Sequence, residues 1–474
     1  MKALLKNLSY SICSNLINFL LAVVVTFVSP KILTVQQYGY FQLYLLYSGY
    51  IGVLHFGWAD GIFLKYGGQY YNKLDKKTCS GQCRLNFIFE IIISIVFLMM
   101  ALLMPNELDK KIILCCVALE ISFCLPCTLL QYLLQTTNRV KEYAISLLVG
   151  RFFYAICVGL IVISNGSTYI ALVAADMLGK LITFIGTFYY CRDIIFSKPP
   201  QILDAVHDAI LNIKIGVALV IANIAGSLII GVVQLAIEEK WSVEVFGKIA
   251  FTISASNFLM VLIRAIALVV FPVLKRIPAN KLPQIYSSLR IALMIPLFGM
   301  LMVYYPARKL LSLWLPQYNE GLRYMALLFP MCIFESKTSL LIETYIKAIR
   351  KERWLLETNV LTLLIAILST IVSVFILQNL TLAVISIVVL LAFRCIRLEM
   401  KLTKEIHVAV YRDILLEIIM SITFIICSGS IQGFRGFLTY LIAYLSYLIV
   451  NRNRMQEVWI TIKSISGNLL KKGG

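Results

Sequence analysis

Long apolar segments, separated by short polar gaps, recur along the chain from Leu8 to Val450. A helix needs roughly 20 mainly apolar residues to cross a bilayer, and fourteen segments approach or exceed that length. They cover residues 8–33, 41–63, 85–104, 112–134, 143–164, 169–191, 211–237, 246–274, 289–305, 322–346, 355–377, 380–400, 414–427 and 437–450. The pattern predicts an all-α, polytopic membrane protein with about fourteen transmembrane helices.

The composition agrees with this interpretation. Of the 474 residues, 60% are hydrophobic and only 14% are charged, whereas soluble domains are nearer half apolar and a quarter charged. The mean hydropathy is +0.87. The gaps on the expected outer side are short, which leaves no room there for a catalytic or receptor domain. We therefore expect one membrane domain whose function resides among its helices.

The net charge of +19 follows from membrane orientation. The basic residues gather in alternate gaps, at Lys73, Lys76, Lys77, Arg84, Arg139, Lys141, Arg192, Lys198, Lys275, Arg276, Lys281, Arg350, Lys351, Arg353, Lys401, Lys404 and Arg412. Among the opposite gaps, 164–168 and 378–379 carry no cation, although a third holds Arg308, Lys309 and Arg323. The positive-inside rule predicts both termini in the cytoplasm. No nucleic-acid partner is expected.

Two halves of the chain resemble each other weakly. Val35-Gln36-Gln37-Tyr38-Gly39 follows the first expected span, and Val243-Glu244-Val245-Phe246-Gly247 follows the seventh. The polar segment 192–212 contains Pro199 and Pro200 and separates the halves. We predict an N-terminal lobe of six spans (1–200), a C-terminal lobe of six spans (201–404), and a final helix pair with a cytoplasmic tail (405–474). Parallel repeats are typical of transporters that bind substrate between the halves.

Short motifs carry a resemblance to a known family. They are Asn15, Pro30 and Leu33 in the first span, Tyr38-Gly39 after it, Gly57, Asp60-Gly61 and Tyr66-Gly67-Gly68 at the end of the second, and Phe246-Gly247 and Phe271-Pro272 around the eighth. In their order and position along nearly the whole chain, they resemble those of polysaccharide and O-antigen repeat-unit flippases. That family belongs to the multidrug/oligosaccharidyl-lipid/polysaccharide exporter (MOP) superfamily.

The resemblance implies a function. Members move an undecaprenyl-pyrophosphate-type lipid-linked oligosaccharide from the inner to the outer leaflet, by alternating access of two six-helix lobes around a central cavity. It also implies the cytoplasmic (inner) membrane as location, and pathway polymerases and glycosyltransferases as partners. Two alternatives remain open, namely a multidrug or cation extruder of the same superfamily and a lipid II-type peptidoglycan precursor flippase, whose span count is similar.

Basic residues inside expected spans are the candidate substrate ligands. A charge near the bilayer centre costs a few kcal/mol or more, so it should face a polar cavity or a partner. Lys and Arg bind phosphate oxygens through charge-assisted hydrogen bonds. The candidates are Arg264, Arg151, Lys180, Lys214 and Lys337. The alternatives are that Arg151 extends to the interface and that Lys214 is an interfacial anchor. An extruder of cations should instead have a cavity dominated by carboxylates and aromatic rings.

Acidic residues and one histidine are the candidates for coupling transport to H⁺ or Na⁺. They are Asp60, Glu120, Asp176 and His55. Glu120 lies near the middle of its span, which suits a proton carrier. Asp176 and Lys180 are four residues apart and share a helical face. They either neutralise each other or form a pair that opens when substrate phosphate competes for Lys180. Asp60 has the alternative role of ending a helix, and His55 that of packing.

Several catalytic signatures are absent from the sequence. It contains no G-x-x-x-x-G-K-[ST] nucleotide-binding loop, no H-E-x-x-H motif and no nucleophile elbow. The twelve cysteines lie mostly in apolar stretches, and the polar-loop pair Cys79 and Cys83 has no nearby histidine to complete a metal site. We expect a non-enzymatic protein without a cofactor or bound metal.

Overall fold

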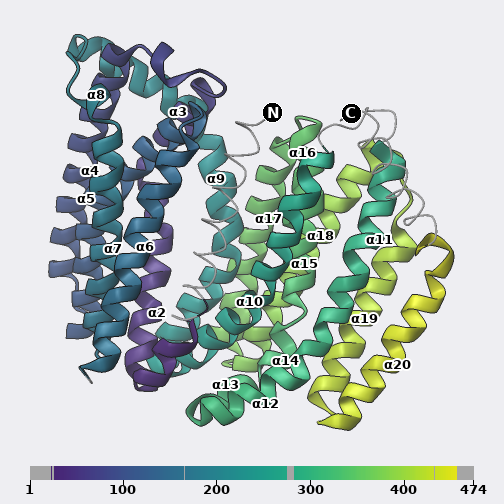
Figure 1. Ribbon diagram of the computed structural model, residues 1–474. Helices are drawn as coiled ribbons and strands as arrows, with labels where there is room; N and C mark the ends of the chain where they lie inside the picture. The colour runs from purple at the N-terminus through teal and green to yellow at the C-terminus, as the bar shows by residue number, and fades with distance from the viewer. Residues whose placement is uncertain (1–22, 24–25, 165, 275–281, 432, 456–474) are drawn as a thin grey trace. The chain divides into compact units, whose positions relative to one another are not determined.

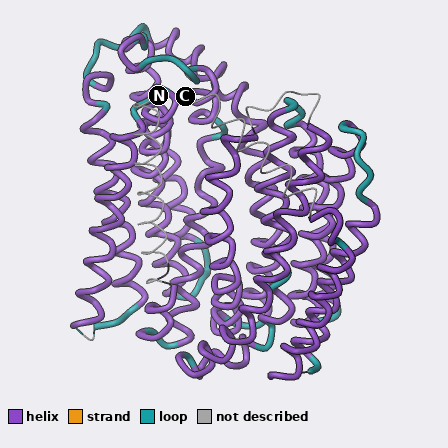
Figure 2. The backbone as a smooth tube through the Cα atoms, turned by 45° about the vertical axis from the view of Figure 1, so that its right-hand side comes forward, coloured by secondary structure: helices purple, strands orange, loops and turns teal. Residues whose placement is uncertain are grey.

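The computed structural model describes residues 23, 26–164, 166–274, 282–431 and 433–455. Within these residues the backbone consists of helices and connecting loops (Figure 2). By length and composition, nine described helices can cross a membrane. The all-α, multi-pass membrane fold is therefore confirmed. The first expected span, 8–33, lies mostly outside the described residues, as does the tail after residue 455.

The chain forms two compact units, Met1–Ile224 and Ala225–Gly474. The first unit is coloured purple to teal in Figure 1. It contains α2 (Val35–Tyr50), η1 (Ile51–His55), α3 (Trp58–Lys65), η2 (Tyr71–Lys73), α4 (Lys76–Leu103), α5 (Leu108–Thr136), α6 (Val140–Ile163), α7 (Tyr169–Tyr190), α8 (Arg192–Ile195) and the start of α9 (Ile202–Lys240). Helix α4 packs on α5, α6 packs on α7, and α5 contacts α7 and α2.

The second expected span, 41–63, is not one continuous helix. After α2 the chain narrows into the 3₁₀ helix η1, and Phe56 and Gly57 then take positive φ values of 49° and 86°. A side chain at Gly57 would also clash with α9, because its Cβ would lie 2.5 Å from the carbonyl carbon of Gly216. Hydropathy averages over such a break, so the apolar pattern alone predicts a straight span here.

The second unit contains the remaining helices. They are the rest of α9, α10 (Val243–Leu274), α11 (Leu282–Met300), η4 (Leu301–Val303), α12 (Tyr304–Trp314), η5 (Pro316–Tyr318), α13 (Asn319–Leu322), α14 (Met325–Leu328), α15 (Met331–Lys337), η6 (Thr338–Ile342), α16 (Glu343–Ala348), α17 (Arg353–Thr370), η7 (Ile371–Ile376), α18 (Leu380–Glu405), α19 (Tyr411–Gly429) and α20 (Phe434–Val450). The π-helices η6 and η7 interrupt the tenth and eleventh expected spans.

The last two helices pack within the second unit. Helix α19 contacts α14 and α20, and α20 contacts α11 and η4. The boundary between the units falls within α9. The division into lobes at residues 200 and 404, and the cavity expected between those lobes, stay predictions.

An ionic contact in the first unit joins η2 and the start of α4 to α8. The Tyr71 hydroxyl donates a 2.7 Å hydrogen bond to Asp193 Oδ1, and Lys76 Nζ lies 2.8 Å from Asp193 Oδ2. Burial by itself would raise the pKa of Asp193, but the hydrogen bonds from Lys76 and Tyr71 outweigh it and hold the pKa below its ordinary value of 3.8.

This contact predicts a pH dependence of stability. Because the folded-state pKa of Asp193 is depressed, its stabilising contribution is fully present above pH 3.8 and is lost as the pH falls through the lower folded-state value. Asp193→Asn should therefore melt below wild type at neutral pH, and the difference should shrink below about pH 4. Melting of the detergent-solubilised protein measures this. A difference that grows in acid would contradict it.

Candidate functional site

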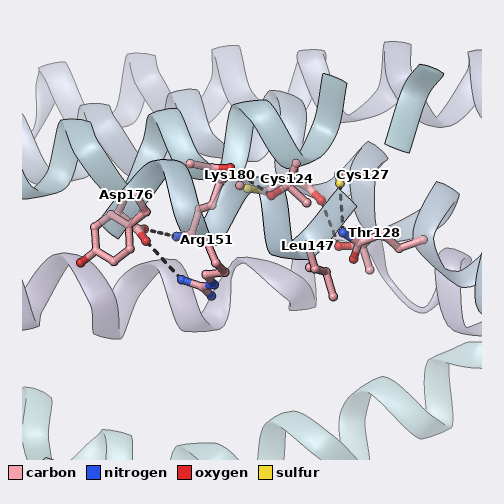
Figure 3. A pocket seen from close by; sticks show the side chains of 12 residues that line it. Cys124, Cys127, Thr128, Leu147, Arg151, Asp176 and Lys180 are labelled. Carbon is pink, nitrogen blue, oxygen red and sulfur yellow. Dashed lines mark hydrogen bonds and ion pairs between the residues drawn. The ribbon is translucent and has the colours of Figure 1, made fainter. Parts of the chain in front are cut away.

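Four ionisable side chains converge inside the first unit. Glu120 comes from α5. Arg151 comes from α6, and Asp176 and Lys180 come from α7 (Figure 3). With the hydroxyl groups of Tyr44 and Ser48 on α2, they form what we call the Lys180 cluster. All four charged members are among the residues that the sequence singles out, and the structure brings them together from three different helices.

Lys180 lies at the centre of the cluster. Its Nζ is 2.7 Å from Glu120 Oε1, 2.7 Å from Asp176 Oδ2 and 2.7 Å from Ser48 Oγ. The Ser48 hydroxyl donates to Glu120 Oε1 at 2.7 Å, and the Tyr44 hydroxyl donates to Asp176 Oδ2 at 2.9 Å. Lys180 thus links α7 to α2 and α5 through hydrogen bonds that are charge-assisted and short.

The carboxylates of the cluster are deeply buried. The side chains of Glu120 and Asp176 are 1% and 4% exposed, whereas that of Lys180 is 23% exposed. Arg151 Nη1 lies 3.7 Å from Asp176 Oδ1, and its side chain is half exposed. The two cations formally balance the two anions. Burial of so many charges within an apolar bundle is tolerated only when they are paired in this way.

A small cavity borders the cluster. It has a volume of 140 Å³ and is lined by Arg151, Asp176 and Lys180 together with polar groups of α5 that include Thr128. Helices α6 and α7 approach closely beside it, since a Cβ on Gly179 would lie only 2.9 Å from the Gly150 carbonyl oxygen. Glu120 Oε2 is buried without a hydrogen-bond partner among the described residues. The cavity therefore presents the two cations, Arg151 and Lys180, together with Asp176 to a small polar guest or ion.

The other two coupling candidates lie at the break between α2 and α3. His55 Nε2 is 3.6 Å from Asp60 Oδ2, and both residues are buried. The backbone N–H of Gly57 donates to His55 Nδ1 at 3.0 Å. His55 and Asp60 therefore form a pair separate from the Lys180 cluster, next to the left-handed residues that interrupt the span.

Lys214 and Arg264 are two further candidate cations from the sequence. Lys214 occupies an exposed position on α9. Arg264, the leading phosphate ligand from the sequence, belongs to α10, but its side chain lies outside the described part of the structure. Their roles in binding substrate stay predictions.

Lys337 occupies a buried ionic network in the second unit. Its Nζ contacts Glu399 and lies 2.7 Å from Glu417 Oε2. Arg290 Nε lies 2.8 Å from Glu399 Oε1, and its Nη1 lies 3.2 Å from Asp413 Oδ2. We call these five residues the Lys337 network. The Lys337 side chain has 0% exposure, so in this structure it holds α15, α18 and α19 together rather than facing a cavity.

Arg394 is a buried cation that the sequence reasoning missed. Its Nη1 and Nη2 each lie 3.1 Å from a carboxylate, those of Glu335 and Glu343, and its Nε donates to Asn359 Oδ1 at 2.8 Å. The two glutamates flank the π-helix η6. The sequence does contain a signal for Arg394, because this charged residue interrupts the apolar segment 380–400. Glu399 and Glu417 of the Lys337 network were missed in the same way.

No protein-family model and no curated protein matches the chain. Solved structures do match. Lipid II flippase MurJ in an inward closed conformation has a TM-score of 0.67 at 13% identity, covering 95% of this chain and 99% of that one. An inward-facing multidrug resistance MATE family transporter of the MOP superfamily has a TM-score of 0.59 at 12% identity, covering 82% and 95%.

A MOP superfamily transporter from Pyrococcus furiosus Vc1 also matches, with a TM-score of 0.54 at 11% identity and coverage of 85% of this chain and 96% of that one. The chain has the fold of MOP superfamily transporters. Identities this low show the fold alone. The fold is the one that the resemblance implies, while the superfamily, the O-antigen flippase family and the substrate stay predictions.

Proposed function

We propose that this protein is a flippase for a lipid-linked oligosaccharide of the undecaprenyl-pyrophosphate type. It moves the repeat unit from the inner to the outer leaflet of the cytoplasmic membrane by alternating access, for surface polysaccharide synthesis. The Lys180 cluster carries the proposal, because it places two cations beside a cavity within a transporter fold. Both termini are cytoplasmic, and pathway glycosyltransferases and a polymerase act before and after it.

The cluster suits a diphosphate substrate because its cations are held by exchangeable partners. Lys180 is neutralised by Glu120 and Asp176, and Arg151 approaches Asp176 from the exposed side. A phosphate group can replace either carboxylate as the partner of Lys180. The displaced carboxylate then loses its counter-charge inside the membrane and takes up a proton. Substrate binding and H⁺ uptake are coupled in this scheme, with Glu120 as the proton carrier; Na⁺ is the other candidate ion.

Two other functions share the fold. The buried carboxylates of the cluster, together with Tyr44 and Tyr154 beside them, are the feature that favours an extruder of organic cations. Against it, a cationic guest would meet Lys180 and Arg151 in the same cavity. A lipid II-type peptidoglycan precursor flippase is the second alternative, and it too requires cations that bind a diphosphate.

A deletion experiment separates these functions. Loss of the gene should abolish surface polysaccharide and cause the lipid-linked oligosaccharide to accumulate, while sensitivity to ethidium stays unchanged. The complementing copy carries a C-terminal green fluorescent protein, which should fluoresce because that terminus is cytoplasmic. Normal polysaccharide with increased ethidium sensitivity would overturn the proposal in favour of an extruder. Loss of viability with arrested peptidoglycan synthesis would favour the lipid II-type function.

A further inference from the structure

A second polar cavity lies at one end of the first unit, away from the Lys180 cluster. It has a volume of 460 Å³ and forms where η2 and the start of α6 meet the joint between α7 and α8. Arg139, Arg192, Tyr71 and Asp193 are among its lining residues. Tyr190, which lines this cavity, lies ten positions after Lys180 on α7. Ten residues span about 15 Å along a helix, so the cavity is separate from the Lys180 cluster.

Arg192 lines this cavity from an exposed position and stacks on a tyrosine ring. Its guanidinium carbon lies 4.5 Å from the centre of the Tyr189 ring. Among the described residues, Arg192 has no hydrogen-bond or ion-pair partner for its side chain. A guanidinium stacked on an aromatic ring is restrained in orientation and still presents its N–H groups. Arg192 is therefore positioned to receive an anion.

Arg139 is a second stacked guanidinium that lines the same cavity. Its central carbon lies 4.4 Å from the centre of the Tyr71 ring. Nε donates to Glu142 at 3.1 Å and Nη1 donates to the Tyr190 carbonyl oxygen at 3.0 Å. Within the described part of the chain, Nη2 makes no hydrogen bond. The bound half of the side chain fixes its position, and the other half can bind a guest.

The acidic residue of the cavity does not offset these cations. Both oxygens of Asp193 are already engaged, Oδ1 by the Tyr71 hydroxyl and Oδ2 by Lys76 Nζ. Lys76 neutralises its charge. Glu142 is the one further carboxylate in contact with the two guanidinium groups among the described residues, and it pairs with Arg139. The charge that remains facing the cavity is positive, carried chiefly by Arg192.

We propose that this cavity binds the phosphate of an anionic lipid head group at the membrane surface. The position supports a lipid, because the cavity lies at the ends of apolar spans and carries tyrosines typical of the membrane interface. Phe196, which directly follows α8, is 72% exposed and can contact the acyl region. Two restrained guanidinium groups suit the paired oxygens of a phosphate. The site is distinct from the Lys180 cluster, and binding of a lipid phosphate there does not require the proposed flippase activity.

Two kinds of lipid carry an anionic phosphate head group that could bind here, and they differ in the type of phosphate. A bilayer phospholipid presents a phosphodiester, whereas a lipid-linked oligosaccharide presents a diphosphate. The test uses the purified full-length protein in a neutral detergent. Binding of dihexanoyl phosphatidylglycerol and of zwitterionic dihexanoyl phosphatidylcholine is measured by thermophoresis, with inorganic pyrophosphate as competitor.

Arg192→Gln should weaken binding of the phosphatidylglycerol at least about tenfold, because the N–H groups of Arg192 have no other partner among the described residues. It should also fold normally for the same reason. Lys198→Gln is the matched control, since it removes one positive charge from an exposed position six residues further along; it should change binding less than about twofold. Arg139→Lys keeps the charge but loses the planar fork of the guanidinium group. Its affinity for phosphatidylglycerol should lie between those of Arg192→Gln and Lys198→Gln.

Competition by pyrophosphate assigns the site to a diphosphate head group, and lack of competition assigns it to a phosphodiester. Either result, if it depends on Arg192, supports the site. Equal weakening by Arg192→Gln and Lys198→Gln would overturn it, because binding would then reflect diffuse charge. So would a wild-type protein that does not prefer phosphatidylglycerol over phosphatidylcholine.

Discussion

Replacing Lys337 with alanine should sharply destabilise the protein. The substitution removes a fully buried cation and leaves Glu399 and Glu417 facing each other, with Arg290 as their remaining counter-charge. Breaking a buried ion pair by removing one partner typically costs about 3–5 kcal/mol, because an uncompensated charge stays buried. We expect most of the variant to be absent from the folded fraction after extraction.

Size-exclusion profiles and melting curves of the detergent-solubilised protein measure this effect. Lys351→Ala is the control, because Lys351 pairs with Glu405 at 3.6 Å and both side chains are nearly half exposed. Its melting temperature should stay close to wild type. A double variant, Lys337→Met with Glu417→Gln, removes one charge of each sign and should recover part of the lost stability. Coincident melting curves for Lys337→Ala and wild type would contradict a structural role for the network.

Replacing Lys180 with glutamine should abolish transport. The substitution removes the group that joins Glu120, Asp176 and Ser48, and with it the phosphate ligand that the carboxylates hold in place. Of the described cations in the cluster, Arg151 then remains, 3.7 Å from Asp176, and Glu120 loses its counter-charge. Lower stability is therefore expected together with loss of surface polysaccharide in cells that carry this copy alone.

A paired variant separates the two effects. Glu120→Gln with Lys180→Gln removes one charge of each sign, so the cluster stays formally neutral and stability should largely return. Transport should not return, because the cation is still missing. If the paired variant restores surface polysaccharide, Lys180 serves only to neutralise Glu120, and the interpretation as a neutralising pair is correct.

The sequence predicts the members of the Lys180 cluster better than it predicts their contacts. The four-residue spacing of Asp176 and Lys180 places them on one helical face, and the structure has them 2.7 Å apart. Glu120 is 60 positions from Lys180, and Ser48 is 132 positions away. Nothing in periodicity relates such distant residues, since their contact depends on how α2, α5 and α7 pack.

Hydropathy predicts the spans because each needs a long apolar run, but it is insensitive to local backbone geometry. The break at Phe56 and Gly57 depends on two positive φ angles and on the close approach of Gly216, which an averaged apolar pattern does not contain. The sequence singles out Lys337 because it is a charged residue within an apolar segment, but it does not show which residues Lys337 contacts. Its partners Glu399 and Glu417 come from two other helices, and their enclosure of the cation is a property of packing.

Above all, we propose that Lys180 binds the diphosphate of a lipid-linked oligosaccharide. The most direct test reconstitutes purified wild type and the Glu120→Gln, Lys180→Gln variant into liposomes that contain a fluorescent undecaprenyl-pyrophosphate oligosaccharide. Transfer between leaflets is followed by accessibility of the sugar to an externally added lectin. We predict protein-dependent transfer by wild type and none above empty liposomes by the folded variant. Equal transfer by both proteins would contradict the claim.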